Sequence, residues 1–459
     1  MKSFLAIFKQ TLRAAVRSRV FHVLLVFILL AVFALPLTVT SDGTAAGELK
    51  LSLTYSLSTV TVLLSLATVW LGCIGLSREI ETYQLHMVMT KPTPGWVVWS
   101  AKWLAVFGMN AAIFVLAATM IYAFIMVRFH YQDFSEQSKA EARREVLVGR
   151  RSYNPERPDF NALARERYEQ MQREGRFAPD HDPGSVVAEL KRQIRAQSTE
   201  IQPGRGRVWR FSGMDVKKTA KEITLRYRLY VDSTQASKQR MTNGIWVVSN
   251  PERAEGEQNA ILPQRVMSGA FHEIKVPGEF LADAERVFVQ YVNRDPGRQS
   301  VIYQPEDGPL FLVPVTGFTG NWLRACSVIL LKLAVLAALG CFLGAAFSPP
   351  VAVFTALSCL CLGAAAHTGI GEPVRGAAGE IVAWSLADRL AHIVAVILDK
   401  TMITLDAGNL AYQLARGRLV ELLLIGKVVA VDFIIKGGLM AALGTWILSR
   451  RELGKVIKQ

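Results

Sequence analysis

Six long apolar runs constrain what this chain can fold into more than any other feature of its sequence. A helix of roughly 20 apolar residues is long enough to cross the hydrocarbon core of a bilayer. Hydrophobic residues make up 51% of the 459 residues, which is high for a water-soluble protein of this size. The sequence therefore predicts an α-helical membrane protein with six transmembrane helices, at Val20–Val39, Tyr55–Leu76, Trp103–Val127, Ala325–Phe347, Val351–His367 and Val428–Leu448.

The polar stretch between the third and fourth runs predicts an inserted extracytoplasmic α+β domain at residues 128–318. Its first part, 128–200, is highly charged and has helical stretches such as Asn161–Glu174 and Ser185–Gln197. In the second part, 205–318, apolar residues recur at every second position, which is typical of half-buried strands. A small antiparallel β-sandwich, or equally a barrel, would accommodate the strands expected at Ile223–Val231, Gly244–Ser249, Glu285–Asn293 and Leu310–Val315.

The net charge of +14 is concentrated beside the apolar runs and not in the insert. From Arg128 to Phe318 the chain has 30 Lys and Arg against 26 Asp and Glu, whereas the rest has 22 against 12. This distribution argues against nucleic-acid binding and favours membrane orientation, because short segments rich in Lys and Arg stay on the cytoplasmic side. Twelve basic residues flank the spans on the side of the termini and six on the other side, so we expect cytoplasmic termini and an extracytoplasmic insert.

The residues before the first apolar run form an amphipathic pattern. Lys9, Arg13 and Arg17 recur every four residues, while Phe4 and Phe8 belong to another face. This pattern predicts a helix that lies on the inner membrane surface before the chain enters the bilayer. A secretory signal peptide is the alternative, but the apolar run is longer than the usual signal core of roughly 7 to 15 residues and further spans follow it.

The sequence contains no recognisable catalytic or metal-binding arrangement. It has neither a G-x-x-x-x-G-K-S/T phosphate loop for ATP nor a G-x-S-x-G nucleophile elbow. His272 and Glu273 resemble the start of a zinc-protease helix, but no second His follows at the required spacing, so we interpret them as an exposed polar pair on a strand. All five cysteines lie in or beside apolar runs, which leaves the insert without a disulfide framework or zinc site. We therefore expect no enzymatic activity, no metal and no cofactor in this chain.

Three ionisable residues fall inside the predicted spans: Lys332 in the fourth, and Asp432 and Lys436 in the sixth. A charge without a partner inside a bilayer costs at least ~2.5 kcal/mol. Two interpretations are open. The three residues line a translocation path, or Asp432 forms a structural pair, either with Lys436 along one helix or with Lys332 across two.

The stretch from residue 368 to 426 is neither fully apolar nor typical of a loop. Leu386, Leu390 and Ile393 follow helical spacing within it. We expect one or two helices at residues 385–424 that lie at the outer membrane interface, and a re-entrant hairpin is the alternative.

Short motifs follow one another in a definite order along the two membrane portions of the chain. Together with the amphipathic N-terminus and the six spans, they resemble the permease subunit of ABC transporters of the type-2 exporter class. The motifs are Ser77–Tyr83 and Met89–Pro92 between the second and third runs, Ala101–Trp103 at the head of the third, and then Phe347–Pro350, Ala366–His367 and Ser449–Leu453.

This resemblance covers about 270 residues and implies properties that the residues alone do not show. It implies a separate ATP-binding-cassette ATPase subunit, which binds the ATP, and a second permease subunit, identical or different, around a shared path in the bacterial inner membrane. It also implies that the cytoplasmic connection between the second and third spans contacts the ATPase through Glu79, Glu81, Leu85, Met89, Lys91 and Pro92.

The residues of this connection are compatible with a docked helix. Glu79 and Glu81 would place negative charge in its first turn, where the helix dipole favours it. Leu85 and Met89 are apolar at helical spacing, and Pro92 would end the helix before the third span. An ordinary interfacial helix that rests on lipid is the alternative.

These observations divide the chain into an N-terminal membrane part at 1–127, the insert at 128–318 and a C-terminal membrane part at 319–459. The function that the resemblance implies is that of an exporter permease driven by a separate ATPase. The insert departs from the resemblance, because a plain member of the class has only a short loop there, and it leaves the substrate open. A membrane-anchored extracytoplasmic binding or scaffold protein without transport activity is the alternative, although six spans are more than an anchor needs.

Overall fold

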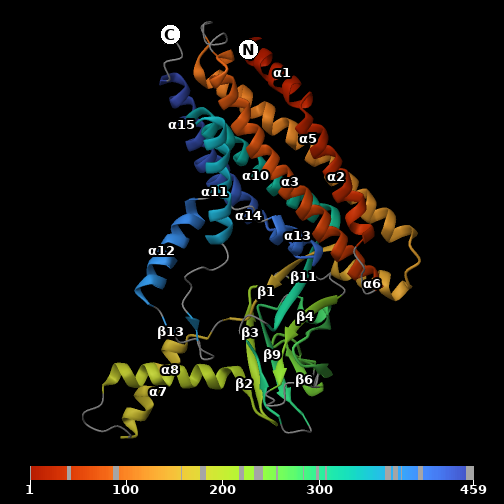
Figure 1. Ribbon diagram of the computed structural model, residues 1–459. Helices are drawn as coiled ribbons and strands as arrows, with labels where there is room; N and C mark the ends of the chain where they lie inside the picture. The colour runs from red at the N-terminus through yellow and green to blue at the C-terminus, as the bar shows by residue number, and fades with distance from the viewer. Residues whose placement is uncertain are drawn as a thin grey trace. The chain divides into compact units, whose positions relative to one another are not determined.

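The computed structural model divides the chain into two compact units, each described by itself (Figure 1). Unit 1 comprises Met1–Gly149, Thr316–Glu372 and Ala387–Gln459, and unit 2 comprises Arg150–Val315 and Pro373–Leu386. The described residues are 2–38, 43–85, 93–156, 158–175, 182–214, 216, 222–231, 241–254, 257–282, 284–295, 299–304, 308–366, 374–375, 381–383, 385–401 and 407–450.

Unit 1 is built around three long apolar helices, α3 (Ala45–Glu81), α5 (Gly95–Tyr131) and α10 (Phe318–Ala346). Each is long and apolar enough to cross a membrane, which supports the prediction of a helical membrane protein. With 37 residues each, α3 and α5 extend over about 55 Å, well beyond the roughly 30 Å of a hydrocarbon core. Both helices therefore continue past the apolar runs that predicted them.

The amphipathic N-terminal helix is confirmed as α1 (Lys2–Val16), and it is followed by α2 (Arg19–Thr38) at an angle of 65°. Ser18 marks the bend, because its Oγ accepts a hydrogen bond from the Phe21 backbone N–H at 3.2 Å and so caps α2. The apolar face of α1 packs against α5, with Ile7 buried. This face therefore covers protein, and the predicted position of the helix on the inner membrane surface stays a prediction.

Glycines bring α3 and α10 into close contact where they cross. A Cβ on Gly72 of α3 would lie 2.9 Å from the Gly340 Cα, and a Cβ on Gly344 would lie 2.5 Å from the Cys73 carbonyl oxygen. Gly340 and Gly344 have the G-x-x-x-G spacing that lets helices approach closely in membranes. Larger side chains at these positions would push the two helices apart.

The remaining apolar runs form shorter or divided helices. α11 (Pro349–Ala366) has 18 residues, and the last run is divided into α14 (Leu422–Lys427), the π-helix η1 (Val428–Gly437) and α15 (Gly438–Arg450). By length and apolar composition, the described residues contain three candidate spans, or four if α1 and α2 together form one span. The expected total of six is supported only in part, because α11 is short and a change of helix type divides the last run.

The end of α5 and helix α6 (Glu136–Glu145) belong to unit 1 and not to the insert. Phe129, Ala142 and Val146 are buried in the apolar core of unit 1. The contacts of the chain therefore divide at Gly149 and Thr316, while the sequence predicted boundaries at 127/128 and 318/319. Polar residues that continue a membrane helix have no apolar pattern, so the sequence did not assign them to it.

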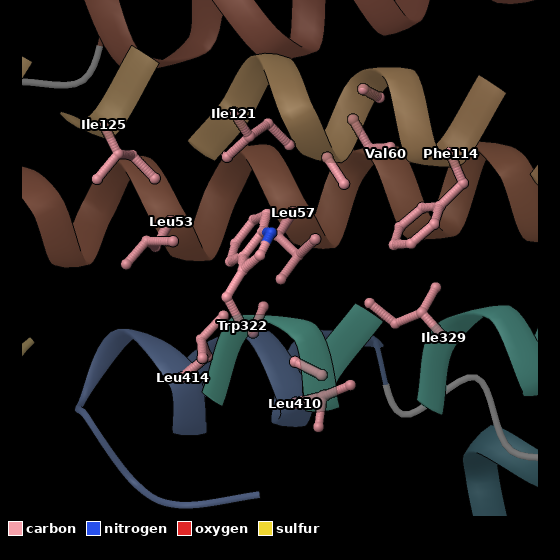
Figure 2. Packing of buried hydrophobic residues seen from close by; sticks show 14 of the residues in the cluster. Leu53, Leu57, Val60, Phe114, Ile121, Ile125, Trp322, Ile329, Leu410 and Leu414 are labelled. Carbon is pink, nitrogen blue, oxygen red and sulfur yellow. The ribbon is translucent and has the colours of Figure 1, made fainter. Parts of the chain in front are cut away.

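Two helices lie in the predicted interfacial region 385–424, α12 (Leu386–Thr401) and α13 (Ala407–Ala415). α13 packs against α3, and Figure 2 shows its Leu410 and Leu414 within the buried apolar cluster. α13 therefore buries its apolar face in protein.

Unit 2 contains two four-stranded sheets that share one apolar core. Core residues come from both sheets, among them Tyr227 and Phe311 from one and Trp246 and Tyr291 from the other. Two separate sheets over a common core form a sandwich and not a closed barrel. In spatial order the sheets are β1 (Val148–Tyr153), β11 (Leu310–Gly317), β4 (Glu222–Arg228), β8 (Phe271–Pro277), and β3 (Gly206–Ser212), β9 (Arg286–Asn293), β6 (Met241–Ser249), β7 (Asn259–Met267).

Smaller elements complete unit 2. Helices α7 (Phe160–Arg173) and α8 (Pro183–Thr199) confirm the charged helical part and pack against each other. Asp159 and Asp182 cap them, each accepting hydrogen bonds from two backbone N–H groups of the first turn. The other elements are a small sheet of β2 (Glu200–Ile201), β10 (Val301–Ile302) and β5 (Tyr230–Val231), the short helix α9 (Gly278–Leu281), and the pair β12 (Val374–Arg375) and β13 (Ile381–Ala383).

His272 and Glu273 lie on strand β8, as the sequence predicted. The His272 ring is half-buried, and its Nε2 lies 2.8 Å from the Met267 carbonyl oxygen. Glu273 is exposed, and its Oε2 lies 3.6 Å from Nη1 of the buried Arg150. Both side chains thus connect neighbouring segments of unit 2.

Candidate functional site

The first candidate region is the junction of α3 and α5, where Glu79 and Lys102 form an ion pair. Glu79 lies in the last turn of α3 and Lys102 in the second turn of α5, and the Lys102 Nζ donates to the Glu79 Oε2 at 2.5 Å. The Lys102 side chain is only 5% exposed. A buried ammonium is costly unless a carboxylate pairs with it. This pair therefore fastens the end of α3 to the start of α5.

The sequence predicted that Glu79 and Glu81 begin a docking helix, and the structure places both in the last turn of α3 instead. α3 ends at Glu81, and Tyr83 turns the chain with a φ of 60°. A carboxylate is unfavourable at the C-terminus of a helix. Lys102 compensates for Glu79, whereas Glu81 is exposed to solvent. The prediction was wrong because α3 continues several residues beyond its apolar run.

Leu85 is fully buried and not accessible to a partner. It belongs to an apolar cluster that includes Leu76 of α3, Trp99 of α5 and Leu448 of α15. In such a cluster, removal of the side chain from water holds the segment in place. Leu85 therefore attaches the connection to the helix bundle.

Among the described residues at the end of α3 and after it, the stretch 81–84 is exposed. Tyr83 is 67% exposed, so this stretch presents an aromatic ring beside the carboxylate of Glu81. These residues therefore form a surface that a partner can contact, whereas Leu85 does not contribute to it. The other predicted contact residues, Met89, Lys91 and Pro92, lie outside the described residues.

The second candidate region is η1, which contains both ionisable residues of the last apolar run. The Lys436 Nζ lies 2.9 Å from the Asp432 Oδ1, and both side chains are half-buried. π-Helical geometry is rare and occurs frequently at functional sites. Of the pairings considered from the sequence, the structure shows Asp432 with Lys436 along one helix.

Aromatic contacts hold η1 against α5 and α10. Phe433 of η1 packs against Trp103 of α5, with ring centroids 6.4 Å apart. Trp103 also donates its Nε1–H to the Ala334 carbonyl oxygen of α10 at 2.9 Å. Lys332 lies half-buried on α10, the helix against which η1 packs. The three predicted intramembrane residues therefore lie on two adjacent helices.

Sequence reasoning missed a further set of ion pairs near the start of α3. Arg128 of α5 lies 3.2 Å from Glu48, and Lys50 pairs with Glu145 of α6. Glu48 also accepts a hydrogen bond from Gln132 at 3.3 Å. A carboxylate in the first turn of a helix is a recognisable dipole signal. Its partners were not recognisable, because they lie far away in the sequence.

These regions consist of ion pairs and packed apolar side chains, which can hold helices together and transmit a movement between them. Within the described residues, no group of three or more His, Cys, Asp or Glu side chains could hold a metal ion. Comparisons with family models, curated proteins and solved structures found no match. A functional assignment therefore rests on the residues and contacts of the chain itself.

Proposed function

We propose that this chain is the transmembrane permease subunit of an ABC exporter, which forms the translocation path while a separate ATPase subunit binds and hydrolyses ATP. The junction of α3 and α5 carries this proposal. The connection between these helices is attached to the bundle by the Glu79–Lys102 pair and by Leu85, while residues 81–84 remain exposed. A partner that binds the exposed stretch and moves would move α3 and α5 with it.

The same end of the bundle also includes the first and last helices of unit 1. Ile7 of α1 and Leu448 of α15 belong to the apolar cluster that buries Leu85. A displacement of the connection would therefore reach α1 and α15 as well. Alternating access requires this kind of joint movement of packed helices around a fixed path.

In this proposal the six spans are α2, α3, α5, α10, α11 and the continuous helical stretch from α14 to α15. The 18 residues of α11 extend over about 27 Å, close to the roughly 30 Å of a hydrocarbon core. α14, η1 and α15 follow one another without a break from Leu422 to Arg450. With six spans, the distribution of Lys and Arg implies cytoplasmic termini and an extracytoplasmic insert, in the inner membrane of a bacterium.

The second partner in this proposal is another permease subunit, identical or different. α2 has apolar side chains that protein does not cover: Val23, Phe27 and Leu30 are each more than half exposed. Their spacing places them on one face of the helix. In the assembled exporter this face would contact lipid or the second subunit.

Co-expression with an ATP-binding-cassette ATPase encoded next to this chain tests the proposal. Replacing Glu81 by Lys and Tyr83 by Ala should lower both retention of the ATPase and its ATP turnover about tenfold, because a contact residue of this kind contributes about 1.4 kcal/mol or more. The permease should still insert at the wild-type level, since both side chains are exposed.

Tyr131→Ala is the matched control, because Tyr131 is 83% exposed and lies at the other end of α5. It should leave both measurements unchanged. Wild-type retention and turnover in the Glu81 and Tyr83 variants would reject the docking surface. An ATPase whose turnover does not respond to the wild-type chain at all would reject the permease assignment.

One observation favours the alternative of a membrane-anchored binding or scaffold protein. Unit 2 has an apolar core of its own, with Tyr227, Trp246 and Phe311 each fully buried, so it is a separate compact unit, as a binding domain held by an anchor would be. Under this alternative, unit 1 only holds unit 2 at the membrane. The ATPase experiment separates the two functions, because an anchor would not change ATP turnover.

A further inference from the structure

An open groove lies between the first turns of α5 and the last turns of α15. It has a volume of about 450 Å³, within the range of about 300–1,000 Å³ that is typical of small-molecule sites. Its surface is almost wholly apolar. The residues that line it include Trp96, Trp99, Ala441, Ala442, Thr445 and Trp446.

Tryptophans form both the edges and the base of the groove. Trp96 of α5 and Trp446 of α15 are 61% and 53% exposed, whereas Trp99 is only 4% exposed. Trp99 fits against α15 because residue 444 is glycine, where a Cβ would lie 2.4 Å from the Trp99 Nε1. The absence of a side chain at Gly444 therefore shapes the base of the groove.

Arg450 adds a positive charge beside the groove. Its guanidinium carbon lies 4.9 Å from the ring centroid of Trp446, within the range of a cation–π contact. In the described part of the chain, Arg450 pairs with no carboxylate. A guanidinium remains charged at physiological pH and binds phosphate through several N–H donors. Apolar walls thus lie next to a cation that is suited to a phosphate.

The groove is also at a suitable depth for a lipid. Trp96 follows the first residue of α5, and Trp446 is one turn from Arg450, the last residue of α15. Tryptophan rings favour the boundary between the hydrocarbon core and the headgroups of a bilayer. Exposed tryptophans at the edges of the groove therefore suit a position where phospholipid headgroups meet acyl chains.

We propose that this groove binds an anionic phospholipid, with an acyl chain against Trp99 and Ala441 and the phosphate on Arg450. The charge of Arg450 selects an anionic headgroup over a zwitterionic one. The site does not depend on the proposed transport function, since it would serve an exporter and a membrane anchor equally.

Quenching of tryptophan fluorescence by brominated acyl chains tests the proposal. The full chain is reconstituted into phosphatidylcholine vesicles that contain increasing fractions of brominated phosphatidylglycerol, or of brominated phosphatidylcholine. The difference between wild type and Trp446→Phe isolates the emission of Trp446. We expect half-maximal quenching of Trp446 at a fraction of brominated phosphatidylglycerol about fivefold lower than the fraction of brominated phosphatidylcholine that has the same effect. A ratio of about five corresponds to about 1 kcal/mol, the contribution of one basic residue.

Substitutions of Arg450 identify the source of the preference. Arg450→Gln should reduce the fivefold ratio to about one, and Arg450→Lys should retain most of it, because the charge remains. Arg416→Gln is the matched control, since Arg416 stacks on Tyr412 at 4.2 Å elsewhere in unit 1, and it should leave the ratio unchanged.

Two results would overturn the proposal. Equal quenching of Trp446 by both lipids would show that only unselected surrounding lipid reaches the groove. No quenching by either lipid, together with disulfide cross-links between two chains that carry Thr445→Cys, would show that a second copy covers it.

Discussion

The buried polar side chains of unit 1 and unit 2 include two groups that respond differently to pH, an ion pair in unit 1 and a cluster of phenols in unit 2. In unit 1, Lys102 is buried as a charged group beside the carboxylate of Glu79. In unit 2, the core contains neutral phenols, those of Tyr227, Tyr291 and Tyr303. A buried charge needs a partner of opposite sign, whereas a buried phenol needs only to remain protonated. The two units should therefore fail under different conditions.

The phenols of unit 2 surround one indole ring. The ring centroids of Tyr227, Tyr291 and Tyr303 lie 4.5, 5.1 and 6.0 Å from that of Trp246. Burial raises the pKa of Tyr227 to about 12, even though the indole N–H of Trp246 beside it acts in the opposite direction. Burial also raises the pKa of Tyr291 and Tyr303 well above the ordinary value. All three are therefore neutral under ordinary conditions.

Loss of the Glu79 carboxylate is expected to have the largest effect, because it leaves the Lys102 ammonium buried without a counter-charge. Glu79→Leu should lower the free energy of unfolding of unit 1 by about 3–5 kcal/mol. Thermal unfolding in detergent and the amount of inserted protein measure this effect.

Two further variants show whether Glu79→Leu loses stability because the charge of Lys102 is unpaired or because the Glu79 side chain is missing. The double substitution of Glu79 by Leu and Lys102 by Met removes both charges and should restore most of the stability, since an apolar pair of similar size replaces the ion pair. Glu81→Leu removes an exposed carboxylate two residues away and should change little. If Glu79→Leu were as stable as Glu81→Leu, Lys102 would not depend on this partner.

High pH should destabilise unit 2 by a smaller amount. The pKa of Tyr227 rises from about 10 in the unfolded chain to about 12 in the fold. Its neutral phenol therefore contributes its full share to the stability of unit 2 below pH 10, and this stability is lost as the pH rises to 12. Each unit of pKa corresponds to about 1.4 kcal/mol, so about 2–3 kcal/mol is lost for Tyr227.

Titration of tyrosinate absorbance measures this ionisation. The wild-type chain should show a late step near pH 12, and Tyr227→Phe should remove the part of it that belongs to Tyr227. Ionisation of every tyrosine near pH 10 while unit 2 stays folded would mean that its core does not exclude charge.

The smallest effect is expected for Asp432→Asn. The Asp432–Lys436 pair lies within one helix and is half-buried, and the amide oxygen of Asn can still accept a hydrogen bond from Lys436. We expect a change of about 1 kcal/mol or less in the same unfolding measurement.

Asp432→Asn also tests whether an ion pair within one helix contributes less to stability than Glu79–Lys102, which joins two helices. A loss of stability as large as that of Glu79→Leu would remove the distinction between them. Normal stability together with a loss of ATP-driven transport would favour a role for Asp432 in the translocation path.

The strands of unit 2 were largely predictable, because alternation of apolar and polar residues is a local property of the chain. β4, β6, β9 and β11 lie where period two predicted strands. β1 was missed because it lies in the part predicted as charged and helical, and β7 was missed because Pro263 interrupts its pattern. Proline is tolerated in β7 because β7 is one of the two edge strands of its sheet.

The candidate site was predictable only where its contacts are local. The four-residue spacing of Asp432 and Lys436 indicated their pair directly. Leu85 was interpreted as a docking residue, because an apolar side chain in a connection does not reveal which surface buries it. Glu79 was interpreted as the start of a helix, because the sequence did not show how far α3 continues.

The sequence by itself determined that the chain forms long apolar helices and a separate β-rich region, since the length and period of apolar residues act over a few turns or one strand. Only the tertiary structure decided that Glu79 meets Lys102, that Gly72 lies against Gly340, and that Leu85 is buried. These contacts depend on the path of the chain between the residues, and packing of whole helices sets that path. For this reason the sequence around an apolar residue such as Leu85 does not show whether the residue lies on a docking surface or in a core.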